Sequence, residues 1–420
     1  MRKTHIRLIV LPLALLISTL LFFVGNRAAS SEEFAEKNPD ARKIISDNIG
    51  SAIKSNQLPT QKDFKFDSMT GTTSEKLKVT YTLDPLLQKE SDSLLKKYRP
   101  DYGAVFMLDA QTGRVLAMSS FQKSDARAPN LNLRATFPAA SIFKVITAAA
   151  AVDYAGLDPS HRIAFNGGNY TLYKRNVLSE TINRWTRFIS LKDAFARSIN
   201  TAFGRLTLES LEPKVLSDYA QKFMFNTPLL ADFPVEQSTA QIPTEKGFEL
   251  TQVASGYNRY NTLSPVHGAM IASAIVNDGK MVHPYLVEEL KDSNDKVVYK
   301  AQSLFESPAI SAQSAEKVRE MMEQTVLSGT SRKTFRRIMR EKRFKEIEMG
   351  GKTGHFTGLN PKGRTDWFVG YASDGENNKV AIATITVNIQ KWTVKSSALA
   401  EMMFRKHFKS VLEEKDLVQR

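Results

Sequence analysis

The chain has 420 residues, of which 42% are hydrophobic and 24% charged, a composition that fits a globular protein with one large core or two modest ones. Its net charge of +14 favours anionic surroundings, such as nucleic acid, phospholipid headgroups or substrates that carry carboxylates. The absence of cysteine excludes a thiol nucleophile, disulfides and a cysteine-based zinc site. The six histidines include no HExxH-like spacing, so we expect neither a metal nor another cofactor.

The start of the chain predicts a membrane anchor. Three basic residues precede an uncharged stretch over residues 8–25, which is about long enough to cross a bilayer. Positive charge ahead of this stretch predicts a cytoplasmic tail over residues 1–7 and a single-pass protein of the inner membrane. The alternative is a cleaved signal peptide, for which Ala28-Ala29-Ser30 is a loose match to a cleavage site. Both interpretations place the rest of the chain on the periplasmic side.

A polar segment follows and predicts a stalk or linker over residues 26–78. The apolar residues of one or two possible amphipathic turns within it are Ala41, Ile45, Ile49 and Ile53. The folded domain is therefore expected at residues 79–420.

The order of strand and helix patterns in this domain predicts a mixed α+β architecture. It begins with a β-hairpin over residues 103–119 and ends with a second hairpin over residues 365–387, whose turn contains Asp374-Gly375. Helical patterns cover residues 141–156, 191–208 and about 396–414. Strands at both ends with helices between them favour a sandwich whose sheet is assembled from distant parts of the chain.

Three short patterns occur in one order along the domain: Ser141-Ile142-Phe143-Lys144, Ser198-Ile199-Asn200 and Lys352-Thr353-Gly354. They match S-x-x-K, S-x-N and K-T-G. The first pattern has little weight by itself, because it also occurs at Ser51, Ser93, Ser120, Ser293 and Ser314. Only Ser141 leads into a nearly uncharged helical run, which must be buried against other elements.

The spacing of Ser141 and Lys144 suits proton transfer. Residues three apart share a helix face, so we expect the Lys144 amine beside the Ser141 hydroxyl. A lysine pKa of about 10.4 makes a poor base at neutral pH, but burial and a nearby cation lower it by several units. Lys352 is the candidate for that cation. The alternative for any isolated S-x-x-K is a serine at a helix start with a lysine that reaches solvent.

The K-T-G segment predicts a strand that enters a hairpin, because Gly350-Gly351 precedes it and a Pro/Gly turn follows. An extended peptide can lie along such a strand, and Gly354 leaves room for its close approach. Lys352 and Thr353 would face the carboxylate of that peptide. The backbone N–H groups of Ser141 and His355 are the candidates for holding an oxyanion.

Over about residues 80–390 the sequence resembles the transpeptidase domain of penicillin-binding proteins. Besides the motifs, the resemblance is carried by YTLDPLLQ (81–88), GAVFMLDAQTGRVLAMSS (103–120), FPAASIFKVITAAAAV (137–152), ISLKDAFARSINTAF (189–203), LSPVHGAMIASAIVNDGK (263–280) and TDWFVGYA (365–372). It implies a fold like that of serine β-lactamases: an antiparallel sheet of about five strands flanked by helices, with an all-helical subdomain.

The resemblance also implies roles for single residues. Ser141 would be the acylated nucleophile and Lys144 its base, and Ser198 would relay a proton to the leaving amine. The substrate would be held by Asn200, Lys352 and Thr353. The implied reaction is D,D-transpeptidation: Ser141 attacks a D-alanyl-D-alanine bond, and an amine of a neighbouring stem peptide captures the acyl-enzyme. The implied partners are peptidoglycan stem peptides, β-lactam antibiotics, the inner membrane and a glycan polymerase.

Two features depart from the family pattern. His355 stands where the family usually carries threonine or serine, which puts the contact of that residue with the substrate carboxylate in doubt. An imidazole can still donate a hydrogen bond, or can carry a charge in mild acid. The short stalk leaves no room for the glycosyltransferase domain of bifunctional members.

Two kinds of hydrolase share part of this motif set. A D,D-carboxypeptidase or a β-lactamase would form the same acyl-enzyme. The deacylating E-x-x-x-N pattern of class A β-lactamases is absent between the second and third motifs, and Asn200 argues against class D enzymes. A carboxypeptidase stays open. An inactive cell-wall scaffold is disfavoured by the intact motif set.

A basic run suggests another class of function, the binding of nucleic acid. Its cations are Arg332, Lys333, Arg336, Arg337, Arg340, Lys342, Arg343 and Lys345. Export makes a nucleic-acid partner untenable. The run predicts a solvated helix face, or a contact with anionic wall polymer or lipid.

Overall fold

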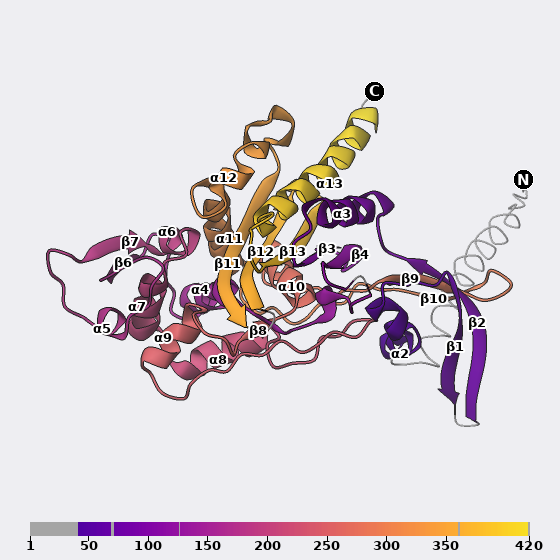
Figure 1. The fold of residues 1–420 in the computed structure, drawn as a ribbon, viewed down its shortest axis with the longest axis horizontal. Helices are drawn as coiled ribbons and strands as arrows, with labels where there is room; N and C mark the ends of the chain where they lie inside the picture. The colour runs from indigo at the N-terminus through magenta and orange to yellow at the C-terminus, as the bar shows by residue number, and fades with distance from the viewer. Residues whose placement is uncertain (1–40, 69–70, 126, 360–361, 419–420) are drawn as a thin grey trace, which may run out of the picture.

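The computed structural model describes residues 41–68, 71–125, 127–359 and 362–418. At its centre is a five-stranded antiparallel sheet with the strand order β11-β12-β13-β3-β4 (Figure 1). The strands are β3 (Tyr102–Asp109), β4 (Val115–Gln122), β11 (Glu348–Leu359), β12 (Lys362–Ser373) and β13 (Lys379–Asn388). Strand β13 pairs with β3, so the last hairpin is joined to the first one of the domain. Both predicted hairpins and the five-stranded α+β fold are confirmed.

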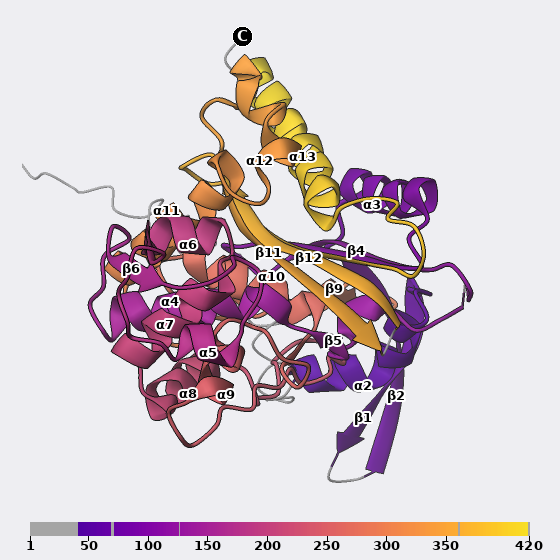
Figure 2. The same cartoon turned by 60° about the vertical axis from the view of Figure 1, so that its left-hand side comes forward.

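Helices cover both faces of the central sheet (Figure 2). One face packs against α3 (Pro85–Tyr98) and α13 (Ser396–Val418). The other packs against α10 (Pro265–Val276), which is buried along its whole length. Helix α11 (Ala312–Leu327) lies along the edge strand β11. The sheet is therefore covered by a hydrophobic layer on each side, one of them containing Trp367 and the other Phe368.

A mostly helical part of the molecule lies on the left of Figure 1, next to α11 and β11. It contains α4 (Lys144–Asp153), α5 (Lys174–Val177), α6 (Leu191–Ala196), α7 (Asn200–Ser210), α8 (Pro213–Lys222), α9 (Phe248–Ala254) and the short hairpin of β6 (Arg162–Phe165) with β7 (Arg187–Ser190). A two-residue pairing of β5 (Phe137–Pro138) with β8 (Thr262–Leu263) lies between this part and the sheet.

Two predicted helices differ in detail from the structure. The helix expected over residues 141–156 begins with a 3₁₀ turn, η2 (Ala140–Phe143). The helix expected over residues 191–208 is divided into α6 and α7. The division occurs because Ser198 adopts a φ of 56°, a left-handed conformation that a continuous right-handed helix does not contain.

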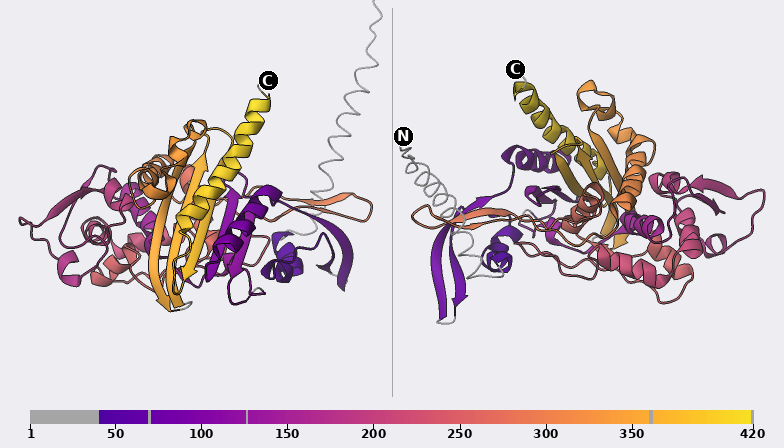
Figure 3. Two further views of the ribbon diagram at one scale, coloured as in Figure 1. Left: turned by 45° about the horizontal axis from the view of Figure 1, so that its top comes forward. Right: turned by 180° about the vertical axis from the view of Figure 1, so that it is seen from behind.

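The chain folds well before residue 79, in the segment for which the sequence predicts a stalk. Helix α2 (Ala41–Lys54) buries Ile45, Ile49 and Ile53 completely in the main core. The following hairpin, β1 (Gln61–Ser68) and β2 (Gly71–Tyr81), joins β9 (Val287–Lys291) and β10 (Val297–Lys300) in a second sheet. Figure 3 shows this sheet at the opposite end of the molecule from the helical part. The partner strands lie more than 200 residues away in the chain, so the local sequence carries no sign of the pairing.

The predicted membrane segment at residues 8–25, the tail before it and residues 26–40 lie outside the described residues. Among the helices of the described ranges, none combines the length and the apolar character that a membrane crossing requires.

Candidate active site

Ser141 lies in the 3₁₀ turn η2, directly before α4, and is half-buried. The residue before it, Ala140, has a φ of 49°, which is rare for a residue other than glycine. The carbonyl of Ala140 lies against Gly256, where an added Cβ would come within 1.8 Å of the oxygen. Gly256 itself has a φ of 64°. The turn that presents Ser141 is therefore held in its conformation by a position that only glycine can occupy.

Lys144 is completely buried beneath this turn. Its Nζ lies 2.9 Å from Ser141 Oγ and 2.8 Å from Asn200 Oδ1, and it also donates a hydrogen bond to the carbonyl of Ser255. Burial lowers the pKa of Lys144 well below its ordinary value, and the charge of Lys352 lowers this pKa further. A lysine that loses its proton this readily can accept the proton of the neighbouring hydroxyl.

Lys352 is the second buried lysine of the cluster. Its Nζ donates hydrogen bonds to Ser198 Oγ and to the carbonyl of Thr353, both at 2.9 Å. Burial lowers the pKa of Lys352 to about 7. Asn200 follows Ser198 by two residues, and its Nδ2 donates to the carbonyl of Tyr170 at 2.9 Å. The second motif therefore contacts both of the others: Ser198, at the left-handed break, binds Lys352, and Asn200 binds Lys144.

Strand β11 holds the K-T-G residues against the turn of Ser141. The missing Cβ of Gly354 would lie 3.3 Å from side-chain atoms of Ala140, Ile142 and Trp367. The small size of this glycine therefore also allows β11 to pack on η2. Next to it, Thr353 Oγ1 lies 2.6 Å from the hydroxyl of Thr330.

His355 also lies on β11 and is about half exposed. Its Nε2 lies 2.7 Å from Asp366 Oδ1, the carboxylate of the residue directly opposite on β12. The other oxygen of this buried carboxylate accepts a hydrogen bond from the backbone N–H of Ser396 at 2.6 Å. The ring of Trp392 approaches the imidazole edge-on at 5.8 Å. His355, which departs from the family pattern, is thus paired with a carboxylate that a second hydrogen bond holds in place.

The structure brings the three motifs together in one cluster, joined by the contacts of Lys144 and Lys352. Four residues that contact the cluster were not predicted from the sequence: Tyr170, Ser255, Thr330 and Asp366. Tyr170 and Ser255 contribute backbone carbonyls, which every residue carries. Asp366 lies in the TDWFVGYA segment, and the family resemblance of this segment is the one feature of the sequence that could have pointed to it. Within the described ranges, no group of three or more metal-ligating side chains occurs.

A family model described as the penicillin binding protein transpeptidase domain matches residues 103–409. The chain belongs to this family. The match includes all three motifs, so the clustered residues lie within the penicillin-binding protein transpeptidase domain.

Curated relatives agree with this assignment to the penicillin-binding proteins. The peptidoglycan D,D-transpeptidase PbpA of Mycolicibacterium smegmatis is 27% identical over 362 residues, which are 76% of this chain and 69% of that protein. Stage V sporulation protein D of Bacillus subtilis is 26% identical over 294 residues, and the match covers 66% of this chain but 43% of that protein. The chain thus spans less than half the length of the sporulation protein.

Solved structures of penicillin-binding proteins share the fold. The crystal structure of PBPA from Mycobacterium tuberculosis matches with a TM-score of 0.62 and 24% identity, over 80% of each chain. The imipenem acyl-enzyme complex of penicillin-binding protein A from M. tuberculosis matches with a TM-score of 0.62 and 23% identity, over 78% of this chain and 79% of that one. At this level of identity the likeness confirms the penicillin-binding protein fold.

Proposed function

We propose that this chain is a peptidoglycan D,D-transpeptidase that cross-links stem peptides through an acyl-enzyme on Ser141. The observation that carries the proposal is the hydrogen bond between Ser141 and the buried, readily deprotonated Lys144. Membership in the transpeptidase family and the similarity to PbpA support it. The same serine would be acylated by β-lactams.

In the first half-reaction, neutral Lys144 takes the hydroxyl proton of Ser141 while Oγ attacks the carbonyl carbon of the penultimate D-alanine. The C–N bond of the tetrahedral intermediate then breaks. The nitrogen of the terminal D-alanine receives the proton taken up by Lys144, with the Ser198 hydroxyl as relay. D-alanine leaves as an amine, and an ester remains on Ser141.

Strand β11 supplies the binding groups. It is one of the two edge strands of the described five-stranded sheet, so an extended peptide can add to it as a further strand. Cationic Lys352 and the hydroxyl of Thr353 would orient the terminal carboxylate of that peptide. The backbone N–H groups of Ser141 and His355 would hold the oxyanion of the tetrahedral intermediate. Asn200 donates one N–H of its amide to Tyr170, and the second N–H would bind the substrate.

In the second half-reaction, the amine of a neighbouring stem peptide attacks the ester carbonyl. A new amide forms as the attacking nitrogen gives up a proton to Lys144, the ester bond to Ser141 breaks, and Oγ receives that proton from Lys144. We place this chemistry on the periplasmic side of the inner membrane, with residues 8–25 as the anchor and a glycan polymerase supplying new strands. Three basic residues ahead of an uncharged stretch support this topology.

The first test labels the full chain in detergent with a fluorescent penicillin. Ser141→Ala is expected to abolish labelling. The matched control is Ser93→Ala, which removes an exposed serine from another S-x-x-K pattern and leaves labelling intact. Labelling of Ser141→Ala at the wild-type level would reject the nucleophile.

A second test separates transfer from hydrolysis. The enzyme receives a donor pentapeptide with and without a D-amino acid acceptor, and the products are identified by mass spectrometry. Transpeptidation predicts exchange of the terminal D-alanine for the acceptor. Hydrolysis without exchange would instead identify a D,D-carboxypeptidase.

A further inference from the structure

The basic run between α11 and β11 does not form the solvated helix face that the sequence predicts. It folds as three short turns: α12 (Arg332–Phe335), η3 (Ile338–Arg340) and η4 (Lys342–Phe344). Their apolar residues Phe335, Ile338 and Phe344 are buried in the core on the α13 side of the sheet. Phe335 stacks on Phe368, with ring centroids 5.4 Å apart. The buried side fixes the path of the backbone and leaves the cations on the outer side.

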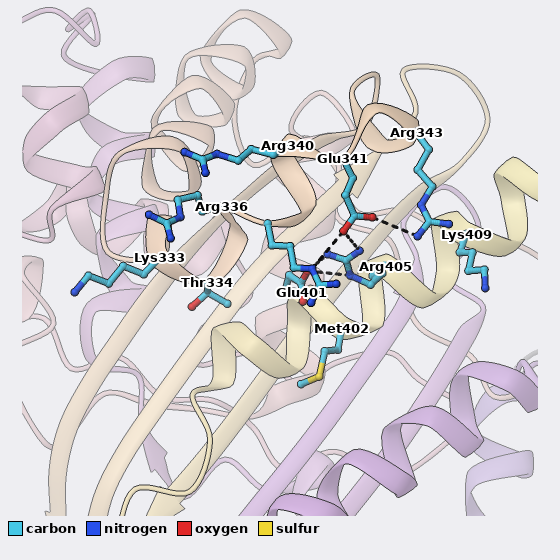
Figure 4. A pocket seen from close by; sticks show the side chains of 11 residues that line it. Lys333, Thr334, Arg336, Arg340, Glu341, Arg343, Glu401, Met402, Arg405 and Lys409 are labelled. Carbon is cyan, nitrogen blue, oxygen red and sulfur yellow. Dashed lines mark hydrogen bonds and ion pairs between the residues drawn. The ribbon is translucent and has the colours of Figure 1, made fainter.

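Together with α13, these turns line a groove with a volume of about 1160 Å³ (Figure 4). Seven cationic and two anionic side chains line the groove, together with one threonine and one methionine. They are Lys333, Arg336, Arg337, Arg340, Arg343, Arg405 and Lys409, then Glu341 and Glu401, and finally Thr334 and Met402. The groove is therefore a concave surface with a strong excess of positive charge.

One part of the groove already binds carboxylates. Arg405 donates to Glu341 at 2.6 Å and, through Nε and Nη2, to Glu401 at 3.1 and 2.8 Å. Arg343 donates to the second oxygen of Glu341 at 3.3 Å. The hydrogen bond from Arg405 lowers the pKa of Glu341, which stays ionised. In this internal cluster the guanidinium groups of Arg405 and Arg343 bind carboxylates at hydrogen-bond distance.

The other part of the groove has cations without such partners. Lys333, Arg336 and Arg340 form no ion pair with any residue that the structure describes, and all three side chains are exposed. Figure 4 shows them on the α12 side of the groove, apart from the cluster around Arg405. Their charges are available to an anion from outside the chain.

We propose that this groove binds an acidic segment of a partner protein. A flat bilayer would contact only the rim of a concave surface, whereas a peptide chain can lie inside it. Five of the seven cations are arginines, whose planar fork binds carboxylates at two points. Met402 adds an apolar contact for a neighbouring side chain of the peptide. The groove is far larger than a single small anion requires, so several acidic residues would bind together.

The test measures binding of a fluorescein-labelled peptide of alternating glutamate and leucine to the full chain in detergent. The variant Lys333→Gln/Arg336→Gln/Arg340→Gln removes three charges of the groove without breaking an ion pair among the described residues. The control Lys65→Gln/Lys76→Gln/Lys89→Gln removes three exposed charges elsewhere. We expect the first variant to weaken binding about tenfold, because three ion pairs with the peptide are lost. The control should change it less than about twofold.

Three results would overturn the proposal. In the first, the wild-type chain does not bind the peptide. In the second, the groove variant and the control variant weaken binding equally, which would mean that net charge alone determines binding. In the third, phosphatidylglycerol added to the detergent micelles binds with the same dependence on the groove while the peptide does not, which would assign the surface to the membrane. Labelling of all three proteins with penicillin reports that they are folded. Because this labelling depends on Ser141 and not on the groove, the proposed function and this inference can fail separately.

Discussion

The amine of Lys352 lies 2.9 Å from the hydroxyl oxygen of Ser198, although 154 residues separate the two in the chain. Strand β11 carries the lysine, and the left-handed break between α6 and α7 carries the serine. Because Lys352 also lowers the pKa of Lys144, the pair connects the base of the proposed reaction to its proton relay.

Replacing Ser198 with alanine is expected to slow acylation about 10²-fold, since a positioned proton-transfer group contributes about 10²–10⁴-fold to a rate. The rate constant of labelling by a fluorescent penicillin measures this effect. The exposed Ser160 provides the control, because Ser160→Ala leaves the cluster intact. A wild-type rate for Ser198→Ala would remove this residue from the proton path.

The rate of acylation should depend on pH through both lysines. It should rise as Lys144 loses its proton, and fall above about pH 7 as Lys352 loses the charge that we propose for binding the substrate carboxylate. The variant Lys352→Arg keeps its charge throughout the accessible pH range. We therefore expect a bell-shaped profile for the wild type and only the rising limb for the variant. An unchanged falling limb in the variant would assign it to another group.

Lys352 should also make stability depend on pH. Its pKa is about 7 in the folded chain against the ordinary 10.5. Between these values the unfolded chain binds the additional proton, so this group makes folding more favourable as pH rises. Below pH 7 both states are protonated and the slope disappears.

Urea unfolding at several pH values can isolate this contribution by comparison with Lys352→Met. From about pH 7 to 10 the wild type should gain up to about 1.4 kcal/mol per pH unit relative to the variant. A constant difference between the two proteins over this range would show that Lys352 has an ordinary pKa.

Helix α2 should contribute to stability like any core helix. Ile49 is fully buried, so Ile49→Ala is expected to lower the free energy of unfolding by about 2–4 kcal/mol. The matched change Ile182→Ala, at an exposed position, should cost less than about 0.5 kcal/mol. Thermal unfolding of the two variants tests this directly. Equal, small effects would mean that residues 41–54 are a dispensable stalk.

Replacing Gly256 should affect acylation more than it affects stability. Gly156 provides a control, since both glycines have a positive φ, of 64° and 66°, but no atom lies within 4 Å of a Cβ added at Gly156. Alanine at either position should cost about 1 kcal/mol of stability through the backbone. Only Gly256→Ala should displace the turn of Ser141, because the new methyl group would collide with the Ala140 carbonyl. We expect it to slow penicillin labelling at least about tenfold.

Local features of the sequence were sufficient to predict part of the fold. The two hairpins could be located because alternating apolar strands and their turn residues lie next to each other in the chain. The contact of Lys144 with Ser141 could be expected because three residues in one helical turn fix the distance. The interruption of the helix at Ser198 could not be expected, because no glycine or proline lies at that point of the sequence.

The sequence by itself determined the order of the three motifs, the pairing of the proposed nucleophile with its neighbouring lysine, and the strands that hairpin turns connect. Only the tertiary structure decided that Lys352 meets Ser198, that Asp366 binds His355 and that α2 belongs to the core. These contacts depend on which strands and helices lie next to each other across hundreds of residues. Such long-range pairing leaves no periodic pattern in the local sequence. Contacts made by backbone carbonyls, such as that of Ser255, leave no trace in the sequence, because every residue has a carbonyl.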